Sequence, residues 1–195
     1  MEVLKDAIFT ITKHVEDVAE ELGEEEVEAL IDAILSSKKV FVYGAGRSGL
    51  VAKAFAMRLM HLGINVFVVG EIITPAIEKE DLLITISGSG ETTSVVNAAK
   101  IAKNVGAKVA LITTYPNSSL GRLADIVVVV KGRTKLRGEK DFVMRQIKGE
   151  HYPLAPLGTL FEIAVLIFLD ALIVELMVRL GKTEEEMRTR HATIE

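Results

Sequence analysis

The feature that most constrains the fold is a set of five short apolar segments that alternate with stretches of helical pattern. The segments are rich in valine and isoleucine and are apolar at consecutive positions; they cover residues 40–43, 66–69, 82–86, 109–113 and 126–130. Strands that are apolar on both faces are typical of parallel sheets that helices cover on both sides. We therefore expect an α/β fold, a three-layer α/β/α sandwich around a five-stranded parallel sheet.

Segments with helical periodicity separate and flank these strands. The expected helices cover residues 3–22, 24–36, 48–61, 91–105, 159–180 and 184–190. Residues 131–157 lose both patterns and carry seven Lys or Arg residues. We interpret this part as a loop excursion, and its charge predicts either a solvated surface or a loop that folds towards an anionic ligand or a partner subunit.

The chain is expected to form a single domain with four consecutive parts. These parts are N-terminal helices (1–37), an α/β core (38–131), the loop excursion (132–158) and C-terminal helices (159–195).

Composition narrows the class of protein. The absence of cysteine excludes disulfides, zinc–thiolate sites and cysteine nucleophiles. A net charge of -4 gives no global attraction to nucleic acid or to anionic membranes. Residues 160–180 are strongly apolar, but Glu162, Asp170, Glu175 and Arg179 interrupt them, so we expect a buried helix and no membrane span.

Two further expectations concern the cellular setting. The first 26 residues carry acidic side chains throughout and resemble neither a secretory signal nor a transit peptide, so we expect a cytoplasmic protein. One glutamine and four asparagines beside abundant Glu and Lys favour a thermophile, because side-chain amides hydrolyse at high temperature.

A glycine-rich turn follows the first apolar segment. Residues 44–49 read Gly-Ala-Gly-Arg-Ser-Gly, a spacing that lets the backbone approach a pyrophosphate at the N-terminus of the next helix. Glu71 follows the second segment, where a ribose-binding acid belongs in dinucleotide-binding folds. A dinucleotide is therefore one possible ligand of this loop, whose candidate contacts are Gly46, Arg47 and Ser48.

A second glycine-rich loop follows the third apolar segment. Residues 87–94 read Ser-Gly-Ser-Gly-Glu-Thr-Thr-Ser and place five hydroxyl side chains at a helix N-terminus. Backbone N–H groups and hydroxyls in such a loop form a neutral cradle for a phosphate monoester. The candidate phosphate-binding residues are Ser48, Ser87, Gly88, Ser89, Gly90, Glu91 and Thr92.

The two loops together favour one small phosphorylated ligand. Both follow strands of a parallel sheet, whose carboxyl ends meet at one edge, and a dinucleotide does not require the second loop. The alternative for the second loop is a helix cap without a ligand, because Ser and Gly also favour that position. Five hydroxyls exceed what a single cap needs.

These loops and the five-strand plan resemble the sugar isomerase (SIS) domain, a family that binds phosphosugars. The stretches 55–63, 69–92 and 156–173, with Arg190 and His191 near the end, are similar to the 6-phospho-3-hexuloisomerases of that family. The resemblance implies interconversion of D-arabino-3-hexulose 6-phosphate and fructose 6-phosphate through a cis-enediolate, without a metal or other cofactor. It also implies the ribulose monophosphate pathway and coupling to hexulose-phosphate synthase. Residues 133–149 depart from the family by their length.

The resemblance further implies a catalytic base. Glu162 matches the family's glutamate, and its neighbours Phe161 and Ile163 would partly shield it from water, as general-base catalysis near neutral pH prefers. Without the resemblance, Glu162 would be interpreted as an acidic residue that stabilises the helix dipole. Arg47 is expected to pair with Glu71 or Glu91, or to contact the substrate.

Among the four histidines, His61 and His191 are candidate catalytic residues. His61 ends the helix after the first glycine loop, where a structural interaction with the helix terminus is the alternative. His191 forms an Arg-His pair that resembles the family and could reach an active site across a subunit interface. His14 is expected on a surface helix, with a structural role.

Two other functions and an assembly state complete the expectations. An isomerase of another sugar phosphate, or a noncatalytic phosphosugar sensor, would share the same loops; a carboxylate near the ligand favours catalysis. Apolar faces on residues 3–22 and 159–180 are more than a five-stranded sheet can bury. They predict a homo-oligomer, either a dimer or a homotetramer.

Overall fold

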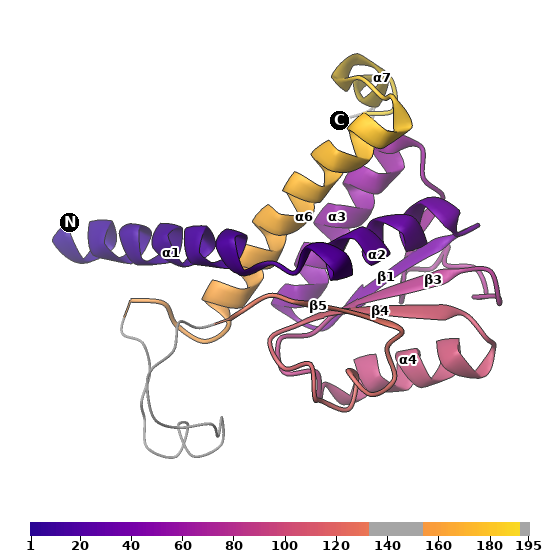
Figure 1. Ribbon diagram of the computed structural model, residues 1–195, viewed down its shortest axis with the longest axis horizontal. Coiled ribbons are helices and arrows are strands. Elements are labelled where there is room, and N and C mark those ends of the chain that lie inside the picture. Colours follow the sequence, from indigo (N-terminus) through magenta and orange to yellow (C-terminus); the bar gives the residue numbers. More distant parts are fainter. Residues whose placement is uncertain (133–153, 192–195) are drawn as a thin grey trace.

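The computed structural model describes residues 1–132 and 154–191, and the predicted loop at 133–149 lies outside these residues. Five parallel strands form one sheet in the order β2-β1-β3-β4-β5 (Figure 1). The strands are β1 (Val40–Gly44), β2 (Val66–Val68), β3 (Leu82–Ile86), β4 (Lys108–Thr113) and β5 (Ile126–Val129). All four strand pairs are parallel, as the consecutive apolar positions predict.

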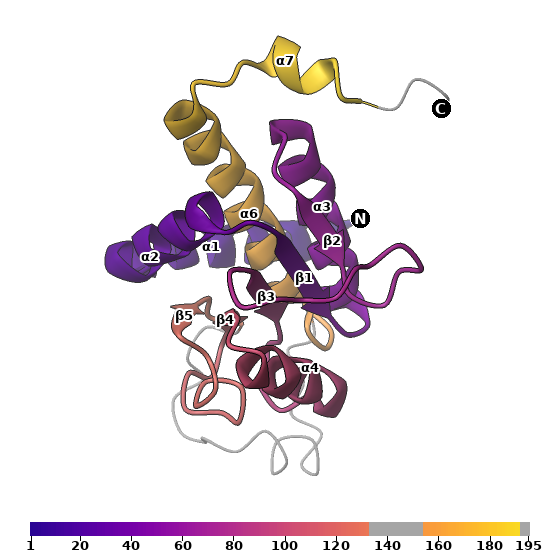
Figure 2. The same ribbon diagram turned by 90° about the vertical axis from the view of Figure 1, so that its right-hand side faces the viewer.

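Helices cover both faces of this sheet. They are α1 (Glu2–Glu21), α2 (Glu24–Ser36), α3 (Arg47–Leu62), α4 (Thr93–Asn104), α6 (Thr159–Leu180) and α7 (Glu184–Arg188). Figure 2 shows α4 on one side of the sheet and α2, α3 and α6 on the other. The three-layer α/β/α sandwich predicted from the sequence is confirmed.

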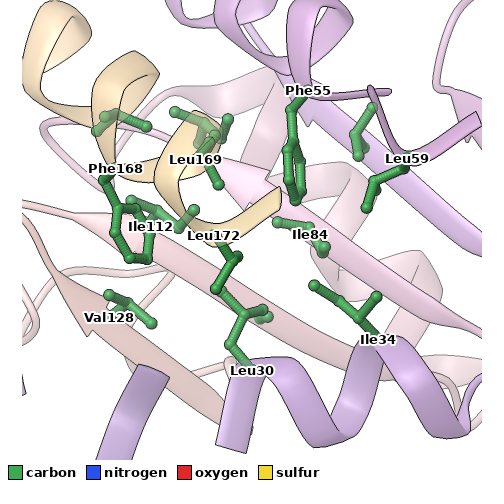
Figure 3. Packing of buried hydrophobic residues seen from close by; sticks show 14 of the residues in the cluster. Leu30, Ile34, Phe55, Leu59, Ile84, Ile112, Val128, Phe168, Leu169 and Leu172 are labelled. Carbon is green, nitrogen blue, oxygen red and sulfur yellow. The ribbon is translucent and has the colours of Figure 1, made fainter. Parts of the chain in front are cut away.

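Two hydrophobic clusters fill the spaces between these layers. Val40 and Val42 of β1 pack with residues of α2, α3 and α6, whereas Phe41 between them packs with residues of α4. This alternation explains why every position of the strand is apolar, since successive side chains point to opposite faces. In Figure 3, side chains of α2, α3 and α6 converge on β3, β4 and β5 in the larger cluster.

The first helix only partly joins this core. The C-terminal half of α1 packs against the larger cluster through Val15 and Val18, whereas its N-terminal half projects beyond the other helices (Figure 1). The projecting half and Met1 before it expose five large apolar side chains, which are Met1, Val3, Leu4, Ile8 and Phe9. Such a surface is typical of a subunit interface.

The structure corrects the prediction for His14. This residue is only 3% exposed, and its Nε2 lies 2.8 Å from the backbone oxygen of Lys131. Helical periodicity could not reveal this contact, because the partner lies 117 residues away in the sequence. Among the helices that the structure describes, none has the length and hydropathy needed to cross a membrane.

Candidate functional site

The sheet places the two glycine-rich loops side by side. Gly44, the last residue of β1, pairs with Ile86, the last residue of β3. The loops that follow these residues therefore leave the same edge of the sheet from adjacent strands. Ligands of open α/β sheets bind at this edge, outside the carboxyl ends of the strands.

The first loop needs glycine because β1 and α3 approach closely. A Cβ at Gly44 would lie 2.7 Å from the backbone of Ser48, and a Cβ at Gly49 would lie 2.7 Å from the backbone oxygen of Gly44. Gly46 is the N-cap of α3, and no side chain caps this helix within the described part of the chain. The N-terminus of α3 thus presents backbone N–H groups beside the half-buried Ser48.

The second loop is a compact turn that holds its own hydroxyls in place. The N–H of Gly90 donates to Ser87 Oγ at 3.2 Å, and the N–H of Glu91 donates to Ser89 Oγ at 3.2 Å. Ser87 Oγ also lies 3.4 Å from Thr92 Oγ1. Three of the predicted phosphate-binding hydroxyls therefore lie on one short segment at the start of α4.

The helix after this loop begins later than the sequence predicted. Thr92 has an extended backbone, with φ -63° and ψ 114°, and α4 starts at Thr93 instead of Glu91. No side chain among the described residues caps this helix. Thr92 therefore belongs to the loop, and the N-terminus of α4 is aligned with the same edge of the sheet as that of α3.

Glu162 lies beside the first loop. Its Oε2 accepts a hydrogen bond from Arg47 Nε at 2.5 Å, and its side chain is 13% exposed. Its neighbour Phe161 packs on the second loop, since a Cβ at Gly88 would lie 3.1 Å from the Phe161 ring. The structure thus brings the predicted base, the predicted arginine and the two loops together from distant parts of the chain.

The two predicted partners of Arg47 bind other groups. Glu71 pairs with Lys53 at 2.6 Å, and Glu91 Oε1 accepts the N–H of Ser119 at 2.7 Å. Arg47 therefore pairs with neither Glu71 nor Glu91, the two ion pairs that the sequence left open. It pairs with Glu162 instead. The ion pair with Lys53 also occupies the acid on which the dinucleotide interpretation depended.

A third polar loop, which was not predicted from the sequence, lies at this edge. Residues 114–122 follow β4, and the buried Ser118 lies so close to Gly90 that any Cβ there would overlap it. The hydroxyl of Ser119 and its N–H hold the pKa of the Glu91 carboxyl below its ordinary value. The signal for this loop was available, because Thr114, Ser118 and Ser119 follow a buried strand in the manner of the other two loops.

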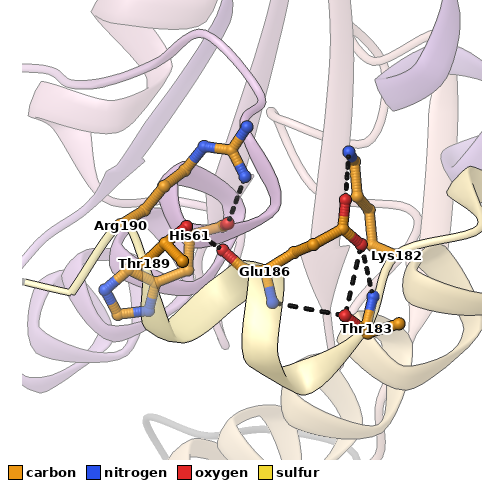
Figure 4. A network of polar contacts seen from close by, with 6 residues as sticks. All are labelled: His61, Lys182, Thr183, Glu186, Thr189 and Arg190. Atoms are coloured by element: carbon orange, nitrogen blue, oxygen red, sulfur yellow. Dashed lines mark hydrogen bonds and ion pairs between the residues drawn. The ribbon is translucent and has the colours of Figure 1, made fainter.

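The two candidate histidines lie elsewhere. His61 occupies the last turn of α3, 13 residues after Ser48, which is roughly 20 Å along a helix. Its ring stacks on that of His191, with 5.3 Å between the centroids and 27° between the planes. Arg190 donates to the backbone oxygen of His61 at 3.4 Å (Figure 4). Within one chain, the structure does not bring these histidines to Glu162.

A cavity of about 440 Å³ surrounds the histidine pair. It lies between α3, α6 and α7 and is lined by both histidines together with Arg58, Asp170 and Arg188. The loop edge, by contrast, has the helix N-termini, the hydroxyls and the carboxylate that a phosphorylated substrate requires. Among the described residues, no group of three or more acidic or histidine side chains is arranged to hold a metal ion.

Comparisons with known proteins identify the family of the chain. The SIS domain family matches residues 33–136. An uncharacterized protein of Aeropyrum pernix is 61% identical over 158 residues, 81% of this chain and 74% of the relative. A Bacillus subtilis protein named 3-hexulose-6-phosphate isomerase is 43% identical over 188 residues, 96% of this chain and 97% of the relative.

A solved structure extends the similarity to three dimensions. A crystal structure from Methanococcus jannaschii, for which the molecular function of 3-hexulose-6-phosphate isomerase has been inferred, is 36% identical. It superposes with a TM-score of 0.72 and covers 100% of this chain and 98% of that one. The chain therefore belongs to the SIS domain family, in the group that contains the 3-hexulose-6-phosphate isomerases.

Proposed function

We propose that this protein interconverts D-arabino-3-hexulose 6-phosphate and fructose 6-phosphate through a cis-enediolate. The observation that carries the proposal is the position of Glu162. This largely shielded carboxylate pairs with Arg47 beside the first loop and directly follows Phe161, which packs on the second loop. Membership of the group that contains 3-hexulose-6-phosphate isomerases supports the choice of substrate.

The reaction needs one base that serves two adjacent carbons. Glu162 takes the proton from C2 of the 3-ketose, and the electrons of that C–H bond form the C2–C3 double bond of the enediolate. The proton then returns to C3, the hydroxyl proton on the C2 oxygen passes to the C3 oxygen, and the carbonyl forms at C2. A single carboxylate can serve both carbons because they are neighbours on the same face of the enediolate.

Arg47 holds this carboxylate in place through its Nε–H. Its guanidinium is 59% exposed, so its remaining N–H groups can reach an oxygen of the substrate. Donors placed where negative charge develops on the enediolate oxygens would lower the barrier.

The phosphate is assigned to the cradle formed by the two loops. Ser87, Ser89 and Thr92 contribute hydroxyls, Ser48 contributes a fourth, and the backbone from Gly88 to Glu91 lines the turn. The N–H groups of Gly90 and Glu91 donate to Ser87 and Ser89 in the structure, so a bound phosphate would share or replace these bonds. A neutral cradle of this kind suits a dianion without the need for a lysine.

We assign His61 and His191 to the active site of a second copy of the chain. Their distance from Ser48 along α3 excludes a shared site within one chain, and the exposed apolar side chains of α1 favour an assembly of dimer or tetramer size. Because fructose 6-phosphate closes a ring through its C5 hydroxyl, an acid at this position would serve ring opening. It would matter more for fructose 6-phosphate than for the 3-ketose.

The first experiment is a proton NMR time course with purified protein and fructose 6-phosphate in D₂O. We expect exchange at C3 of fructose 6-phosphate and the appearance of a 3-ketose. Glu162→Gln keeps the shape of the side chain but removes the base, so its exchange rate should fall by about 10³-fold. Glu175→Gln, an exposed acid on the same helix, should exchange like the wild type.

Two results would favour the other functions. A wild type that binds the sugar phosphate yet exchanges nothing over hours would indicate a noncatalytic sensor. Exchange with another sugar phosphate in preference to fructose 6-phosphate would keep the enediolate chemistry and change the substrate.

The cellular setting is part of the same proposal. We place the enzyme in the cytoplasm and in the ribulose monophosphate pathway, coupled to hexulose-phosphate synthase, which makes or consumes its 3-ketose. The scarcity of Gln and Asn supports a thermophilic source.

A further inference from the structure

His14 makes a specific contact with the segment that leaves β5. Its Nε2 lies 2.8 Å from the backbone oxygen of Lys131, and because a carbonyl only accepts, Nε2 carries the proton and donates. Its Nδ1 is buried and has no hydrogen-bond partner among the described residues. An apolar side chain would fill the same space without a buried unpaired nitrogen, so the bond to Lys131 is what distinguishes histidine here.

Helix α1 holds Lys131 at two points. His14 binds its backbone, and Glu21, seven residues later on the same face of the helix, forms an ion pair with its ammonium group. Val18, between them on that face, is 5% exposed and belongs to the larger hydrophobic cluster. The chain is therefore fixed where it leaves the sheet.

The residue after Lys131 touches the active site. A Cβ at Gly132 would lie 3.0 Å from Phe161 Cβ and 2.8 Å from Thr114 Oγ1. The ring of Phe161 contacts Gly88 of the second glycine-rich loop, which we call the phosphate loop (residues 87–92). A Cβ at Gly88 would lie 3.1 Å from this ring. Phe161 is thus packed between Gly132 and Gly88, and Glu162 is the next residue of α6.

We propose that His14 is a positioning residue for the isomerase reaction. By fixing Lys131, it holds Gly132 against Phe161 and so sets the position of the Glu162 carboxylate above the phosphate loop. This inference rests on the proposed function, in which Glu162 is the base.

Loss of the His14 contact should affect kcat and KM differently. The phosphate loop is anchored by hydrogen bonds within it, from Gly90 N–H to Ser87 Oγ and from Glu91 N–H to Ser89 Oγ, and neither of these involves Lys131. A displacement of the base by about 1 Å costs on the order of a hundredfold in rate. Loss of the His14 contact should therefore lower kcat and leave KM nearly unchanged.

Substitution of His14 by Gln or by Asn tests this positioning role, because the two amide side chains differ by only one methylene group. Gln carries an N–H group about as far from the backbone as Nε2, whereas Asn reaches only as far as Nδ1. We expect His14→Asn to lower kcat by about tenfold to a hundredfold, with KM within about twofold of the wild type. His14→Gln should retain kcat within about threefold.

A matched control separates positioning from general loosening of α1. Val18→Ala removes buried contacts from the same face of the helix but keeps both anchors of Lys131. If Val18→Ala, at an equal loss of Tm, lowers kcat as much as His14→Asn does, the positioning role is overturned. The same holds if His14→Gln is as slow as His14→Asn.

A second variant covers the case in which His14→Asn does not fold. Glu21→Gln removes the exposed ion pair with Lys131, and Glu20→Gln is its control on the same turn. We expect a two- to threefold loss of kcat, at about constant KM, for Glu21→Gln alone; equal rates would overturn the inference. A wild type without any turnover would overturn the proposed function and this role with it, whereas an active wild type with an unchanged His14→Asn would overturn this role alone.

Discussion

The carboxylate of Glu91, in the phosphate loop, binds the neighbouring loop that follows β4. The sequence placed Glu91 among the phosphate-binding residues, yet its carboxylate turns to the N–H of Ser119 in the loop after β4. An acid directed at a phosphate would repel it. The carboxylate instead links two of the three loops at the carboxyl edge, while its own N–H remains with Ser89.

This contact predicts an acid-sensitive contribution to stability. The hydroxyl and N–H of Ser119 hold the pKa of Glu91 below its ordinary value of 4.5. A folded-state pKa below the unfolded one adds stability that is complete above the unfolded pKa and is lost as the pH falls through the folded pKa. Glu91→Gln should therefore melt at a lower temperature than the wild type at pH 7. The two Tm values should converge as the pH falls from 4.5 through the lower folded-state pKa.

Calorimetric melts of both proteins across this range would check the prediction, with Glu185→Gln as an exposed control on α7. A difference in Tm that persists unchanged in acid would mean that the negative charge of Glu91 does not stabilise the fold.

At the scale of elements, α3 connects the two regions that carry the proposed site residues. Its N-terminus forms the first glycine loop, and its last turn carries His61 beside the cavity. The contact of Gly44 with Gly49 fixes how closely this helix approaches β1. A glycine at either position is therefore a packing requirement, whatever the loop binds.

Gly49→Ala should push α3 away from β1, because the new Cβ would lie 2.7 Å from the Gly44 oxygen. We expect a loss of about 2 to 3 kcal/mol in the free energy of unfolding, measured with guanidinium chloride. Gly181→Ala is the control: this C-cap residue of α6 is in the left-handed region, with φ 62° and ψ 31°, but a Cβ there would have no atom within 4 Å. Backbone strain alone should cost about 1 kcal/mol, so an equal loss in both variants would contradict the packing explanation.

At the scale of the whole molecule, one chain does not bring its proposed catalytic residues together in one site. Glu162 and the phosphate loop lie at the carboxyl edge of the sheet, and the histidines lie at the far end of α3. Exposed apolar side chains on α1 and α6, such as Phe9 and Val174, offer the surface through which a second copy could join.

A subunit-mixing experiment tests whether two copies share a site. With fructose 6-phosphate as substrate, Glu162→Gln and His191→Ala should each be strongly impaired alone. When co-expressed they should regain up to about a quarter of wild-type activity, because a hybrid dimer retains one intact site. Glu162→Gln with Ser87→Ala should recover nothing, since both residues belong to the same chain's site. No recovery in the first pair, with hybrids confirmed by differently tagged subunits, would exclude histidines supplied by a partner.

The local pattern of the sequence was sufficient for the architecture and for the two loops. Strand and helix periods repeat over a few residues, and parallel strands necessarily bring their carboxyl ends to one edge, so the meeting of Gly44 and Ile86 could be predicted. The identity of Glu162 as a candidate came from the resemblance to the family. Its shielding from water followed from its apolar neighbours.

Only the tertiary structure decided which distant residues meet. Arg47 pairs with Glu162 across 115 residues, and His14 binds Lys131 across 117. Periodicity specifies which face of a helix is apolar, but the partner of a polar side chain depends on how the helices pack over the sheet. The length of α3 likewise separates His61 from the loops, because a helix that begins at the site carries its last residue away from it.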